Sequence, residues 1–159
     1  MTTRLAAWLL VLCLVAPAAA ADAPEMDGAG FRDYVAQRHG RPLVVNLWAT
    51  WCAPCIKELP GLATVRRTVP DEQLDMIGVS FDFDPGELAA FLDANPLNYP
   101  VFLASPDLME TLGVTSIPLT MLFDTNGLQV MRHEGYIAPD ALCAHLRAHA
   151  SHITDCGEK

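Results

Sequence analysis

The chain has 159 residues, 52% of them apolar, and its 19 acidic against 10 basic side chains give a net charge of −9. This length fits one domain with a core of its own. The acidic balance argues against a nucleic-acid-binding protein and against binding to anionic lipid, and it is consistent with simple solubility.

The first 21 residues have the pattern of a secretory signal peptide. Arg4 precedes the apolar run LAAWLLVLCLVA, and small residues with A-x-A spacing follow at 18–20 and 19–21. The run is shorter than the ~20 apolar residues that a membrane-spanning helix needs, which favours cleavage over an uncleaved anchor. We expect a signal peptide at 1–21, a linker at 22–27 and one domain at 28–159, in a protein that works outside the cytoplasm.

The expected elements follow in chain order. Apolar residues at helical spacing around Phe31 predict a first helix, and the run 43–48 predicts a buried strand. A helix should begin near Cys52, and Pro60 should kink it or end its first part. The later elements are a strand at 74–81, a helix from Asp84, a strand at 99–104, a short helix at 105–112, a hairpin at 119–123 and 128–133, and a last helix from Pro139. Strands that alternate with helices before a closing hairpin predict an α/β fold with a mixed sheet and helices on both faces.

The motif WATWCAPC places two cysteines, Cys52 and Cys55, where a strand gives way to a helix. The free N–H groups and the dipole at a helix N-terminus stabilise a thiolate, which makes Cys52 a good nucleophile. Cys55 lies one turn further on, close enough to form a small disulfide ring, and Pro54 stiffens that turn. This arrangement favours dithiol–disulfide exchange, in which Cys52 attacks and Cys55 resolves the mixed disulfide.

Two other interpretations of the cysteine pair are weaker. A zinc site needs about four ligands, and the sequence has no second CxxC motif to supply them. A purely structural disulfide does not require a strand-to-helix position or flanking tryptophans. We therefore predict redox exchange, with the Cys52–Cys55 disulfide as the redox group and no other cofactor or metal.

At this point the chain resembles a known family. The run VVNLWATWCAPC is similar to the active-site strand and motif of thioredoxin-fold proteins, in particular the extracytoplasmic TlpA/ResA-like branch. SIPLTMLFDTNG, residues 116–127, resembles the proline loop and hairpin of that family, and residues 84–103 resemble its helix–strand insertion. The resemblance covers about residues 28–150 and implies a thioredoxin-like fold.

The resemblance also implies roles for single residues. Pro118 matches the cis-proline that faces the cysteines and shapes the substrate groove, and Ile117 would offer its backbone to an extended substrate. Glu58, three residues after Cys55, matches an acidic residue that tunes the thiols, although a solvated helix carboxylate is the simpler alternative. Asn46 stands where cytoplasmic thioredoxins carry a buried Asp, and since Asn cannot accept a proton, proton transfer would fall to Glu58 or water.

The two tryptophans of the motif are expected to lie in different surroundings. We expect Trp48 in the core and Trp51 at the rim of the site, where an aromatic side chain can contact a substrate. The candidate catalytic residues are Cys52, Cys55 and Glu58, and the candidate substrate-binding residues are Trp51, Ala53, Pro54, Ile117 and Pro118.

Near the C-terminus, two cysteines and three histidines fall between Cys143 and Cys156. A Cys143–Cys156 disulfide that pins the tail to the last helix is the first interpretation, because the remaining cysteines are even in number and the expected compartment is oxidising. The second is an incidental cluster. The third is a metal site that uses His145 and His149, spaced i, i+4.

The resemblance implies a periplasmic thiol–disulfide oxidoreductase that reduces disulfide-bearing proteins and draws electrons from a membrane thiol donor. Cytochrome c and copper-site maturation are roles of this branch, but Leu119 stands where cytochrome-maturation members often carry Glu. A disulfide oxidant or isomerase on the same fold, and a metal-binding chaperone that uses the C-terminal cluster, remain alternatives. We expect a monomer without nucleic-acid partners.

Overall fold

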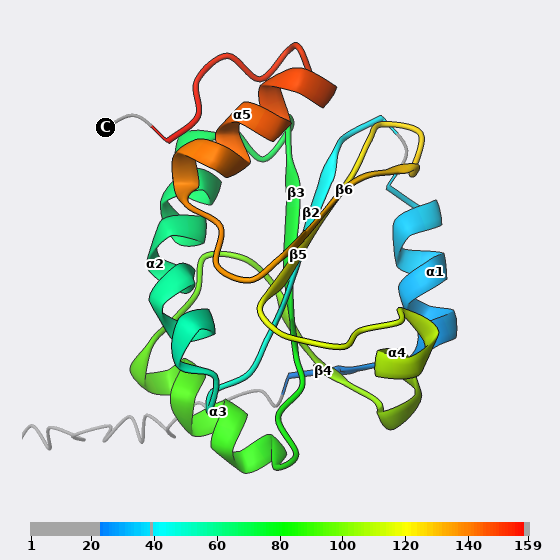
Figure 1. The fold of residues 1–159 in the computed structure, drawn as a ribbon, viewed down its shortest axis with the longest axis vertical. Coiled ribbons are helices and arrows are strands. Elements are labelled where there is room, and N and C mark those ends of the chain that lie inside the picture. The colour runs from blue at the N-terminus through cyan, green and yellow to red at the C-terminus, as the bar shows by residue number, and fades with distance from the viewer. Residues whose placement is uncertain (1–22, 39, 158–159) are drawn as a thin grey trace, which may run out of the picture.

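The computed structural model describes residues 23–38 and 40–157. It contains a six-stranded mixed sheet with the strand order β1-β4-β3-β2-β5-β6, covered by helices on both faces (Figure 1). The predicted α/β, thioredoxin-like fold is therefore confirmed. In chain order the elements are β1 (Glu25–Met26), α1 (Gly28–Ala36), β2 (Leu43–Trp48), α2 (Ala53–Thr68), β3 (Asp75–Ser80), α3 (Pro85–Ala94), β4 (Val101–Ala104), α4 (Pro106–Thr111), β5 (Leu119–Phe123), β6 (Gln129–Glu134) and α5 (Pro139–His149).

Strand β2 lies in the middle of the sheet, and all six of its residues are buried. It pairs in parallel with β3 and antiparallel with β5, so that Trp48 lies opposite Ser80 and Leu47 opposite Leu119. A strand buried on both faces needs a nearly continuous apolar run, which LVVNLW provides. This register brings the ends of β2 and β3 and the start of β5 to one edge of the sheet.

The helices lie in two layers. Figure 1 shows α2, α3 and α5 on one face of the sheet and α1 and α4 on the other. Leu62, Leu142 and their neighbours form a core under α2 and α5, and Phe31 and Leu108 belong to a second core under α1 and α4. A third cluster contains Trp48, both motif cysteines and Leu88 of α3. The cysteine motif therefore packs against this third cluster of buried side chains.

The expected linker at 22–27 is wrong for its last residues. Glu25 and Met26 form an edge strand that pairs in parallel with β4, and Met26 is buried. Asp27 then caps α1 by accepting a hydrogen bond from the Gly30 N–H. The sequence pattern is too short to reveal a two-residue strand, because only its pairing with β4 makes these residues part of the domain. β4 belongs to the predicted insertion and separates β1 from β3.

Helix α2 does not end at Pro60 but runs without a break to Thr68. Proline removes a single helical N–H, and the buried face of Leu59, Leu62 and Val65 compensates for that loss. α2 also lies close to α5, since a Cβ on Gly61 would come within 2.7 Å of the Pro139 ring.

The expected signal peptide at 1–21 lies outside the described residues. Among the helices that the structure describes, none has both the length and the apolar character of a membrane-spanning segment.

Candidate active site

Cys52 and Cys55 form a disulfide at the N-terminus of α2, with their Cα atoms 5.2 Å apart. Cys52 is the N-cap residue, and its Sγ accepts a hydrogen bond from the Cys55 N–H at 3.3 Å. Cys52 is 6% exposed and Cys55 is fully buried. A partner can therefore reach only the first sulfur, which is also the sulfur that the helix N-terminus favours as a thiolate.

The proline loop lies at the same edge of the sheet as the disulfide. The Ile117–Pro118 peptide bond is cis, and Pro118 directly precedes β5. Because Leu119 pairs with Leu47 and with Glu134, the loop lies beside the end of β2. Ile117 is half-buried and packs against the cluster that contains both motif cysteines. The structure thus brings together the two segments in which the sequence places substrate contacts.

Glu58 is buried in α2, three residues after Cys55, and is not a solvated helix carboxylate. It is 1% exposed, and Oε1 accepts hydrogen bonds from the Asn46 amide at 2.8 Å and the Thr120 hydroxyl at 3.2 Å. Oε2 accepts a hydrogen bond from the Ile137 N–H at 3.0 Å. Burial raises the pKa of the Glu58 carboxyl, while the bonds from Ile137 and Thr120 oppose that rise.

Asn46, predicted from its strand position, lies in this polar cluster. Its side-chain N–H₂ group donates to Glu58 and also to Thr120 Oγ at 3.3 Å. Thr120 is a member that the sequence analysis missed. The nearby Tyr99 hydroxyl is buried and has no hydrogen-bond partner among the described residues. Burial raises the pKa of the Tyr99 hydroxyl, and the charge of Glu58 adds to that rise. The available signal was Thr120 itself, a polar residue inside the otherwise apolar strand LTMLF.

A second network positions the loop that precedes Cys52, and the sequence analysis also missed it. The Asp82 carboxylate accepts hydrogen bonds from the N–H and hydroxyl of Thr50 and from the hydroxyl of Ser80. Asp82 is 6% exposed and lies two residues after the end of β3. The segment after β3 thereby holds the start of the cysteine motif through Thr50.

The rim of the site is aromatic. Trp48 is fully buried and Trp51 is 56% exposed, as expected, and Ala53 and Pro54 are exposed in the first turn of α2. The ring of Trp51 stacks on that of Phe83, with centroids 6.3 Å apart and an angle of 9° between the planes. The Lys57 ammonium lies 5.1 Å from the centre of the Tyr136 ring.

The C-terminal cysteines are joined to each other. Cys143 and Cys156 form a disulfide with Cα atoms 5.5 Å apart, which is the pairing of the first interpretation, and both residues are buried. Beyond it, the Gly157 N–H donates to the Thr68 hydroxyl at 2.9 Å. In the described part of the chain, no three His, Cys, Asp or Glu side chains lie close enough together to hold a metal ion.

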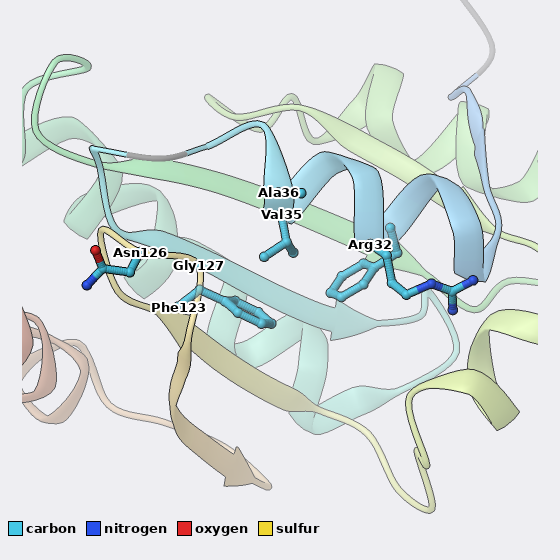
Figure 2. Close-up of a pocket in the computed structure, with 7 residues that line it drawn as sticks. Arg32, Val35, Ala36, Phe123, Asn126 and Gly127 are labelled. Atoms are coloured by element: carbon cyan, nitrogen blue, oxygen red, sulfur yellow. The ribbon is translucent and has the colours of Figure 1, made fainter.

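A separate pocket of 320 Å³ lies between α1 and the β5–β6 turn. Figure 2 shows Val35 of α1 and Phe123 of β5 at its walls, with Asn126 in the turn. Its lining contains neither a thiol nor a carboxylate. This pocket therefore supplies no group for cysteine chemistry.

The comparisons with known proteins agree with this geometry. A family model described as the AhpC/TSA family matches residues 16–132. The chain belongs to the AhpC/TSA family. A curated relative, the thiol:disulfide interchange protein DsbE of Yersinia pestis, is 32% identical over 123 residues, which are 75% of this chain and 62% of that protein. The thiol-disulfide oxidoreductase ResA of Bacillus subtilis is 26% identical over 110 residues, 67% of this chain and 62% of that one.

Solved structures show the same fold for this member of the AhpC/TSA family. A thiol-disulfide isomerase from Corynebacterium glutamicum has a TM-score of 0.67 at 21% identity and covers 72% of this chain and 83% of its own. The predicted resemblance to TlpA/ResA-like thioredoxin-fold proteins is thus confirmed. The chain spans less than two thirds of the length of the two curated relatives, 62% in each case.

Proposed function

We propose that this AhpC/TSA family protein is a thiol–disulfide oxidoreductase that reduces disulfides in protein substrates. One observation carries the proposal: a disulfide with a single reachable sulfur lies at a helix N-terminus beside the proline loop. The relatives named ResA and DsbE support the same chemistry.

The reaction starts from the reduced protein. The Cys52 thiolate attacks one sulfur of the substrate disulfide, and the other sulfur leaves as a thiolate that takes up a proton. The Cys55 thiol then loses its proton and attacks Cys52 Sγ, which releases the second substrate sulfur as a thiol. Two electrons pass to the substrate, and the protein is left with the Cys52–Cys55 disulfide found in the structure.

Glu58 is the group we assign to the proton of Cys55. It lies one turn further along α2, is buried on the same side of the helix, and has a raised pKa. Asn46 cannot take a proton but holds the carboxylate in place with its N–H₂ group. The surface that binds the substrate chain is formed by Trp51, Ala53, Pro54, Ile117 and Pro118.

We further propose that the protein works in the periplasm as a monomer and is re-reduced by a membrane thiol donor. The leader-like pattern at 1–21 and the relatives named ResA and DsbE support this setting. A role in cytochrome c maturation has less support, because Leu119 replaces the Glu common in that group.

Insulin reduction by dithiothreitol tests the activity. The protein should accelerate precipitation of the insulin B chain, and Cys52→Ala and Cys55→Ala should abolish the acceleration. The Cys143→Ser/Cys156→Ser double variant, which leaves the motif intact, is the matched control and should stay active. Activity that persists in Cys52→Ala contradicts the proposed mechanism.

A further inference from the structure

An apolar groove of 440 Å³ opens beside Trp51, the residue that precedes the disulfide. Its walls come from the segments that follow β2, β3 and β4 and from α4, and they include Trp51, Phe83 and Met109. The groove therefore lies outside the carboxyl ends of three neighbouring parallel strands, which is where α/β sheets commonly bind ligands.

Three apolar side chains of this groove are unusually exposed. Phe83 is 93% exposed, Trp51 56% and Met109 40%. Only two other large hydrophobic side chains among the described residues are comparably exposed, Leu128 and Tyr136. Exposed apolar side chains that gather at one place, with two rings stacked, mark a binding surface rather than chance exposure.

The groove borders the residue that precedes the reacting cysteine. Trp51 forms part of its wall and is bonded directly to Cys52, while Asp82 holds Thr50, the residue before Trp51. A polypeptide that presents its disulfide to Cys52 comes close to this wall, because Trp51 is the neighbouring residue. A segment of that same polypeptide is therefore the occupant best placed to enter the groove.

The negative charge of the groove indicates which polypeptide segments can bind in it. Its lining contains two carboxylates, Glu25 and Asp82, and no basic side chain. Asp82 is buried and already bonded to Thr50 and Ser80, whereas Glu25 is exposed. The whole chain, these two carboxylates included, carries a net charge of −9. A segment with basic residues beside its apolar side chain matches this field.

We propose that the groove is a subsite for the substrate polypeptide that takes an aromatic or large aliphatic side chain next to the reacting cysteine, flanked by a basic residue. The inference rests on the proposed exchange at Cys52. It predicts that the enzyme prefers substrates with a large apolar side chain at this position, because burial of one such side chain favours binding by about tenfold or more.

Two synthetic peptides test the proposal. Each carries one cysteine in a mixed disulfide with glutathione and has an arginine nearby, and they differ in a Phe or an Ala next to the cysteine. The reduced full chain, freed of reductant, converts each to peptide thiol and glutathione while its own motif becomes a disulfide. We expect a rate constant about tenfold higher for the Phe peptide.

The ratio of the two rate constants identifies the groove. Phe83→Ser and Met109→Ser should bring the ratio toward one, and the matched control Leu128→Ser, an exposed apolar residue of the β5–β6 turn, should leave it unchanged. A ratio near one in the unaltered protein, or a high ratio that survives both groove variants, overturns the subsite alone. If neither peptide is reduced, or if Cys52→Ala still reduces them, the proposed function fails.

Discussion

Glu58 is a carboxylate held away from water inside a thioredoxin-like core, and its three donors do not fully offset the cost of burying its charge. Asn46, Thr120 and the Ile137 N–H bind its two oxygens, yet burial still raises its pKa. Natural cores keep such a group where its proton has a use, which is the reason we connect Glu58 with Cys55.

Glu58→Gln should therefore change how stability depends on pH. A carboxyl with a raised folded pKa favours the folded state fully at low pH, and this contribution is lost as pH rises from about 4 through the folded pKa. The unaltered protein should lose stability relative to the variant over that range. Urea denaturation at several pH values measures the difference.

The control is Glu110→Gln, which replaces an exposed carboxyl of α4. It should follow the unaltered protein at every pH. A difference between Glu58→Gln and the unaltered protein that does not change with pH would contradict a raised pKa at this position.

At the scale of elements, the two disulfides belong to different helices, α2 and α5, and occupy different environments. The motif disulfide begins α2 at an edge of the sheet, where one sulfur is accessible. Cys143–Cys156 joins α5 to the tail that follows it, and both of its residues are buried beside the Val65 and Leu146 side chains of one core. The motif disulfide is placed to exchange with other disulfides, whereas the buried C-terminal disulfide restrains the chain.

Replacing Cys143 and Cys156 by Ser should cost stability without removing activity. The bridge closes a loop with a sequence separation of 13, and the chain-entropy model gives about 3 kcal/mol for a loop of that size. Chemical denaturation of the double variant measures the loss. Insulin reduction should persist in conditions where the variant is folded, and an unchanged free energy of unfolding would show that the bridge contributes nothing.

At the scale of the whole molecule, the direction of electron flow is a difference in stability between two forms of the entire fold. A disulfide is a strong oxidant when the reduced protein is the more stable form, and a weak one when the oxidised protein is. The Ala53–Pro54 dipeptide does not decide this difference in stability by itself, because the helix dipole, Glu58 and the core cluster around Trp48 all contribute.

An equilibrium titration against a redox buffer, with Cys143 and Cys156 replaced by Ser, measures that balance. We expect a midpoint near about −250 mV or lower, in the range of thioredoxin and of dedicated reductants. A midpoint near about −120 to −180 mV would identify an oxidant or isomerase instead. Unfolding free energies of the oxidised and reduced forms should differ in the matching direction.

Local patterns in the sequence determined much of this molecule. The central strand at 43–48 and the helix that Asp84 caps follow from apolar runs and capping residues, and the structure has both where they were expected. The cysteine motif is contiguous, so its position at a strand-to-helix junction could be predicted. Of the two outcomes expected at Pro60, an end to the first part of the helix is wrong, because helix propensity is local, while the packed face that keeps α2 intact is not.

Tertiary structure alone decided the surroundings of these residues. Glu58 meets partners 12, 62 and 79 positions away in the chain, and whether it is solvated or buried depends on all three. The strand at Glu25–Met26 exists through its pairing with β4, and the groove of Trp51, Phe83 and Met109 gathers residues from the segments after β2 and β3 and from α4. The physical reason is the same in each case: local periodicity indicates which face of an element is apolar, but only the packing of distant segments determines what that face meets.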